Sequence, residues 1–86
     1  MKSTLDSLNE VLTYIEFFKS SMTDWELLTA IQDQMDKYAI TKQFIWNFNY
    51  PKNLDFGPVT LACVKLYEII NELESKCKHD LTNKQQ

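Results

Sequence analysis

Residues 44 to 58 read Phe-Ile-Trp-Asn-Phe-Asn-Tyr-Pro-Lys-Asn-Leu-Asp-Phe-Gly-Pro. This stretch contains the only glycine, both prolines and five of the eleven aromatic residues of the chain. Because glycine and proline are the strongest interrupters of helices, the segments on either side are free to form long helices. The aromatic cluster beside the interruption is either part of a small core or a surface that binds another molecule.

The segment before this stretch predicts a first helix over residues 4–20. Its apolar residues recur at spacings of three and four, the pattern of an amphipathic helix. Ser3 or Thr4 is suited to cap the helix, and Asp6 in the first turn complements the helix dipole. The apolar positions are Leu5, Leu8, Val11, Leu12, Ile15, Phe18 and Met22.

A second helix is predicted to begin at Asp24. Thr23 and Glu26 stand three residues apart, the spacing of a capping box, and Met22 and Leu27 are placed to form a hydrophobic staple. The end of this helix is open to two interpretations. A helix that continues to about Asn47, with a kink near residue 40, is favoured over a strand across residues 44–50, because no second strand is available to pair with it.

A third helix is predicted to begin at Pro58, since proline is well tolerated at the first helical position. Its apolar residues step by four and three over nearly three heptads, which indicates a seam for packing against another helix. The seam serves either intramolecular packing, which is the default, or a dimer interface. It consists of Val59, Cys63, Leu66, Ile70, Leu73 and Cys77.

The two cysteines, Cys63 and Cys77, are predicted to be free thiols. Fourteen residues of one helix separate their Cα atoms by about 21 Å, whereas a disulfide requires a separation below about 7 Å. Buried, reduced thiols are typical of a reducing compartment.

The length of 86 residues predicts one helical domain over residues 1–78, followed by a flexible tail over residues 79–86. We expect an all-α fold, a small antiparallel bundle of three helices, or of four if the second helix breaks near residue 40. No apolar run approaches the roughly 18 residues of a membrane span, and the first residues do not resemble a secretory signal. A cytoplasmic protein without a membrane partner is therefore expected.

The net charge of −3 and the absence of arginine argue against nucleic acid as a partner. All nine basic residues are lysines, whereas arginine is the usual residue for bidentate recognition of phosphate and guanine. No basic run compensates for the acidic balance.

No motif in the chain predicts catalysis, a metal or a cofactor. Cys77 and His79 are two residues apart, but two cysteines and one histidine are too few for a structural zinc site. The single histidine is not part of a nucleophile–base pair, and one glycine cannot form a phosphate-binding loop. We therefore expect a protein that is not an enzyme.

The favoured function is a small adaptor or regulator that binds another protein and inhibits or caps it, as inhibitors encoded by phages or plasmids, secretion chaperones and immunity proteins do. This expectation is an association from fold and size. Trp and Tyr dominate the energetics of many interfaces, so the predicted contact residues are Trp46, Phe48, Tyr50 and Phe56, with Trp25 second.

Two alternatives remain open. The first is a structural homo-oligomer, such as a homodimer, joined through residues 44–50 or through the third-helix seam at Val59, Cys63, Leu66, Ile70 and Leu73. The second is a small-molecule pocket between the helices, surrounded by the aromatic side chains.

Overall fold

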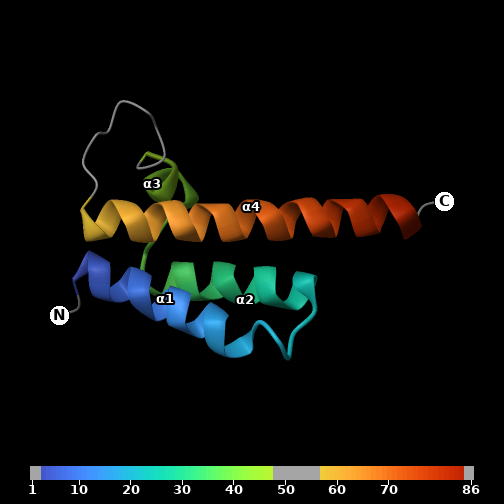
Figure 1. Cartoon of the computed structure of the whole chain (residues 1–86), viewed down its shortest axis with the longest axis horizontal. Coiled ribbons are helices and arrows are strands. Elements are labelled where there is room, and N and C mark those ends of the chain that lie inside the picture. The colour runs from blue at the N-terminus through green and yellow to red at the C-terminus, as the bar shows by residue number, and fades with distance from the viewer. Residues whose placement is uncertain (1–2, 48–56, 85–86) are drawn as a thin grey trace.

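The structure is a computed structural model that describes residues 3–47 and 57–84, in which four α-helices are formed (Figure 1). They are α1 (Thr4–Phe18), α2 (Asp24–Lys37), α3 (Lys42–Asn47) and α4 (Pro58–Lys84). No strand occurs in these two ranges, so the prediction of an all-α fold is confirmed.

The four-helix alternative is the one observed. A continuous helix to Asn47 is wrong, and so is a strand over residues 44–47, while residues 48–50 lie outside the described ranges.

Helix α1 begins where the sequence predicts it. Ser3 is the N-cap, and its side-chain oxygen accepts a hydrogen bond of 3.1 Å from the backbone N–H of Asp6. The helix ends at Phe18, two residues before the predicted end. Its buried apolar side chains, Leu8, Val11 and Ile15, belong to the predicted stripe.

Helix α2 begins with the predicted capping box. The N–H of Glu26 donates to Thr23 Oγ1 at 3.2 Å, and the N–H of Thr23 donates to Glu26 Oε1 at 2.9 Å. The second of these bonds lowers the pKa of the Glu26 carboxyl, because the N–H stabilises the charged form. Met22 packs against the core that contains Leu27, and the direct contact of a staple between these two side chains stays a prediction.

Helix α2 ends in a Schellman motif that contains no glycine. The N–H of Ile40 donates to Met35 O at 2.8 Å, and the N–H of Ala39 donates to Asp36 O at 3.1 Å. Between them, Ala39 adopts the left-handed conformation with φ of 56°, a position that glycine usually occupies. The motif buries Met35 and Ile40 together in the core. It also turns the chain away from the axis of α2.

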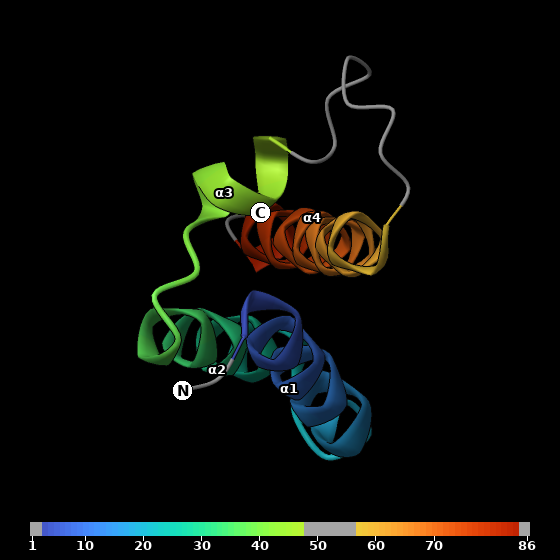
Figure 2. The same cartoon turned by 90° about the vertical axis from the view of Figure 1, so that its left-hand side faces the viewer.

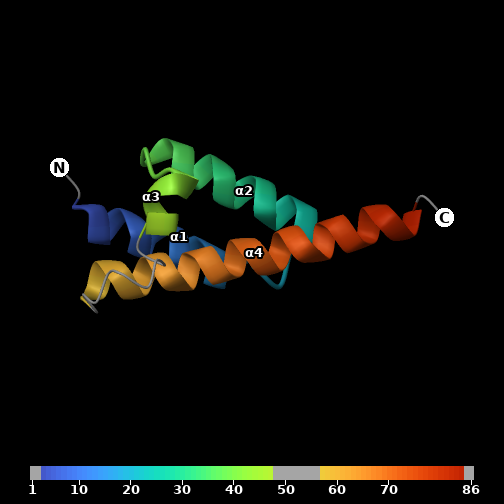
Figure 3. The same ribbon diagram turned by 90° about the horizontal axis from the view of Figure 1, so that it is seen from above.

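Helix α4 lies between two layers (Figure 2). The antiparallel pair α1 and α2 covers one side of α4, and the short helix α3 covers the other. Seen from above, α4 continues past the start of α2 towards the C-terminus (Figure 3). Every other helix therefore packs on α4.

The predicted seam of α4 is buried inside the single chain. Val59 is half-buried against the core, and the other five positions are fully buried: Cys63, Leu66, Ile70, Leu73 and Cys77. Both cysteines are free thiols, as predicted. The seam is thus used for intramolecular packing.

Helix α4 begins at Pro58, as predicted, and its backbone remains helical to Lys84. Residues 79–84, predicted as part of a tail, are therefore helical. The flexibility of that tail stays a prediction. Within the described ranges, no helix has both the length and the apolar composition needed to cross a membrane.

Replacing Ala39 by Gly should stabilise the protein by about 0.5–1 kcal/mol, because glycine adopts the left-handed conformation without the steric cost of a Cβ atom. Urea unfolding measures this change. Ala30→Gly, in the interior of α2, is the matched control and should cost about 1 kcal/mol. Destabilisation of the same size by both substitutions would contradict the assignment of Ala39 to the helix cap.

Candidate functional site

Four large apolar side chains are exposed among the residues that the structure describes. The exposed fractions are 78% for Phe17, 63% for Trp25, 41% for Trp46 and 59% for Leu61. Isolated exposed apolar residues are common on protein surfaces, so exposure alone does not identify a site. The informative question is which of these side chains is held in a fixed position beside other interface-forming groups.

Helix α3, which carries Trp46, is started by a threonine cap. Thr41 Oγ1 accepts a hydrogen bond of 3.0 Å from the N–H of Phe44, and Thr41 O accepts one of 3.3 Å from the N–H of Ile45. Threonine is a preferred N-cap because it satisfies donors that the first helical turn leaves open. The Schellman motif and this cap are adjacent, so the chain changes direction within residues 38–41.

An apolar side chain and an ion pair both contribute to the attachment of α3. Ile45 is completely buried, and full burial of such a side chain is worth about 1.5–3 kcal/mol. Lys42 Nζ lies 2.9 and 2.8 Å from the two carboxylate oxygens of Glu74. Because both of these side chains are substantially exposed, their ion pair contributes about 0–1 kcal/mol. Burial of Ile45 therefore contributes more to the attachment of α3 than this ion pair does.

Trp46 lies against Tyr67 of α4. The ring centroids are 5.2 Å apart and the planes are inclined by 46°, which is within the range of favourable aromatic pairs. The two rings, with Lys42 and Gln43, line a shallow depression of about 310 Å³. Gln43 Nε2 donates to Asn47 Oδ1 at 3.2 Å. The site thus has an aromatic centre and a polar edge.

A second aromatic group lies at the end of α1. The Phe18 ring is 4.5 Å from the Tyr14 ring and 4.9 Å from the Phe17 ring. Phe17 is highly exposed, and Trp25 in the first turn of α2 is exposed as well. Residues 19–23 connect these two helix ends (Figure 1).

The structure separates the predicted contact residues. Trp46 lies on α3, whereas Trp25 lies in the first turn of α2, and that end of α2 points away from α3 (Figure 1). These two tryptophans therefore do not form one surface. Phe48, Tyr50 and Phe56 lie outside the described residues.

Tyr67, the partner of Trp46, and the exposed Phe17 are not among the contact residues predicted from the sequence. A signal for Tyr67 exists in the helical period, since it stands beside the buried Leu66 without belonging to the fully buried stripe. The contact between Trp46 and Tyr67 itself depends on tertiary packing.

The thiol of Cys63 is not suited to nucleophilic chemistry. Burial disfavours the thiolate and raises the pKa of Cys63 from 9.0 to about 11. Over the described side chains, no three His, Cys, Asp or Glu residues lie close enough together to hold a metal ion. What this part of the molecule offers is an aromatic contact surface.

No protein family, curated protein or solved structure matches this chain.

Ile45→Ala should lower the free energy of unfolding by about 2–4 kcal/mol, because it removes buried methyl groups and leaves a cavity between α3 and α4. Lys42→Ala, which removes only an exposed ion pair, should cost less than about 1 kcal/mol. Urea unfolding of both variants checks that Ile45→Ala lowers the free energy of unfolding more than Lys42→Ala does. A larger loss from Lys42→Ala would show that the ion pair, and not burial, attaches α3.

Stability should fall between about pH 9 and pH 11 through the titration of Cys63. In this interval the unfolded chain releases the thiol proton while the folded protein retains it, so rising pH favours unfolding. Below about pH 9 this contribution is constant. The slope of unfolding free energy against pH, measured by urea titration, should be smaller in Cys63→Ala, and equal slopes would contradict the raised pKa.

Proposed function

We propose that this protein is a non-enzymatic adaptor or regulator that binds another protein, with Trp46 as the central contact. The observation that carries this proposal is the half-exposed Trp46 ring held against Tyr67 on a helix with a fully buried attachment. Tryptophan and tyrosine are the residue types most enriched among contacts that dominate binding energy.

Trp46 is held in place before any partner binds. Its helix is capped by Thr41 and attached through Ile45. Its ring also contacts a second aromatic ring. A side chain that is already ordered loses less conformational entropy on binding.

The surroundings of Trp46 also resemble a protein interface. Lys42 and Gln43 line the depression beside the two rings, and polar groups around an apolar centre are typical of such surfaces. Because the α4 seam is buried within the chain, a partner contacts this outer surface. The proposed action is inhibition or capping of that partner.

Trp46→Ala should abolish partner binding while the protein stays folded. The loss in stability should be smaller than the roughly 3–5 kcal/mol of a fully buried tryptophan, since the ring is 41% exposed. Trp25→Ala is the matched control. It removes the same residue type from the first turn of α2, the end of that helix that points away from α3.

A photo-cross-linking residue in place of Gln43, introduced in cells of the source organism, reports the partner.

The expected result is one cross-linked protein that is retained in Trp25→Ala and lost in Trp46→Ala. Sedimentation over a range of concentrations determines whether the partner is a second copy of the chain. A dimer that dissociates on Trp46→Ala would replace the proposal by self-association. Equal cross-linking in both variants would contradict a role for Trp46 in binding.

A further inference from the structure

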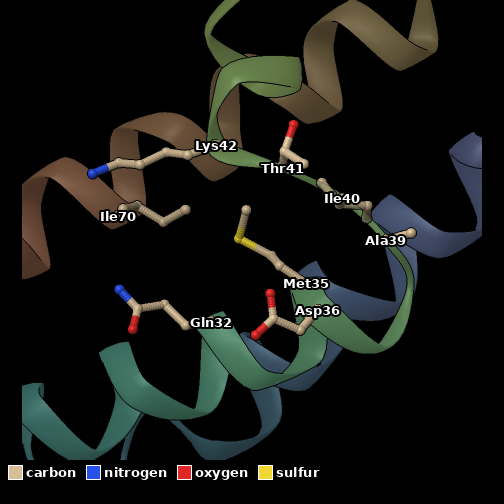
Figure 4. A pocket seen from close by; sticks show the side chains of 8 residues that line it. All are labelled: Gln32, Met35, Asp36, Ala39, Ile40, Thr41, Lys42 and Ile70. Carbon is tan, nitrogen blue, oxygen red and sulfur yellow. The ribbon is translucent and has the colours of Figure 1, made fainter.

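A partly open cavity of about 350 Å³ lies where α2, α3 and α4 meet (Figure 4). Residues from the end of α2, the connection at 39–41, the start of α3 and the middle of α4 line it. This volume is at the lower end of the range for small-molecule sites, about 300–1,000 Å³. Among the described residues, none that lines it is aromatic, whereas the pocket suggested by the sequence was surrounded by aromatic side chains.

The floor of the cavity is apolar. Met35, Ile40 and Ile70 are all buried core residues, and Met35 and Ile70 extend towards one another across the cavity (Figure 4). The methionine thioether is flexible and polarisable, so it adapts to apolar ligands of different shape. The floor suits an apolar group of the ligand.

One edge of the cavity carries a carboxylate. Gln32 and Asp36 are one helical turn apart on α2, and their polar ends lie along the same edge (Figure 4). Lys42 is the cation that lines the cavity, but its Nζ is bound by Glu74 at 2.8 and 2.9 Å. Lys37, the residue after Asp36, has its Nζ 5.5 Å from the centroid of the Tyr38 ring. Neither lysine neutralises Asp36.

The cavity is formed by backbone geometry that the fold maintains. Ala39, which also lines it, is the left-handed residue of the Schellman motif. The hydrogen bond from Ile40 N–H to Met35 O connects two residues of the floor. A preformed cavity requires little ordering when a ligand binds.

We propose that this cavity binds a small ligand with an apolar body and one ammonium group. The apolar body would contact Met35, Ile40 and Ile70, and the ammonium group would pair with the Asp36 carboxylate. An anion of the same shape would be repelled by Asp36. This site does not depend on the proposed function of Trp46.

The test uses phenethylammonium as the probe and 3-phenylpropionate as its anionic counterpart. In methyl NMR titrations, phenethylammonium should shift Met35, Ile40 and Ile70 saturably, with a Kd on the order of 1 mM for so small a ligand. The anion should bind much more weakly. Equal affinity for the two probes, or no saturable shift of these methyl groups, would overturn the proposal.

Asp36→Asn should weaken binding of phenethylammonium by about three- to ten-fold, as expected for loss of a partly exposed ion pair. Asp33→Asn is the matched control, since Asp33 is exposed on the same helix but does not line the cavity. Gln32→Trp, which fills the open edge, should abolish binding in a folded protein. Equal effects of Asp36→Asn and Asp33→Asn would overturn the role of Asp36.

A free amine and the amino terminus of a peptide both present this chemistry. The tripeptide amide Phe-Ala-Ala distinguishes them. If the tripeptide amide binds more than about ten-fold more tightly than phenethylammonium, the site is assigned to a peptide terminus. If it binds equally or more weakly, the site is assigned to a free amine. Both ligands belong to the proposed class. Trp46→Ala should leave binding of the amine unchanged, so failure of the Trp46 proposal is recognised separately.

Discussion

Burial of one stripe of α4 is the constraint on which the other helices depend. Cys63, Leu66 and Ile70 are almost completely removed from solvent, and α1, α2 and α3 each pack against this helix. A chain of 86 residues has little apolar surface to spare. A central helix that is covered from two sides uses that surface efficiently. This economy explains why α3 folds back onto α4 from the side opposite α1 and α2.

Local rules predicted the helices well where their signals lie within a few residues. The capping box at Thr23 and Glu26, the start of α4 at Pro58 and the stripe of α4 each depend on neighbours along one helix. The break after α2 was harder because it uses Ala39 in a conformation typical of glycine. Thr41 does provide a cap signal, but the aromatic residues after it also alternate as in a strand, so the strand stayed open as the less favoured alternative.

The candidate site was predictable only in part, because exposure depends on which face of a short helix packs. Within α3, Ile45 is buried and Trp46 is half-exposed, although the two are adjacent and both apolar. Which of these two side chains is buried depends on the face of α3 that contacts α4, and the sequence alone does not specify that face. The pairing of Trp46 with Tyr67 joins residues 21 positions apart, so it required the tertiary structure.

Helix α3 supports both surfaces, since Lys42 lines the cavity beside Asp36 as well as the depression beside Trp46. Its position is set mainly by Ile45, because apolar burial exceeds the contribution of an exposed ion pair. Apolar burial is also insensitive to screening by salt, whereas exposed ion pairs weaken with ionic strength. The geometry of both surfaces should therefore persist over a wide range of salt, whereas the exposed Lys42–Glu74 ion pair should weaken as the ionic strength rises.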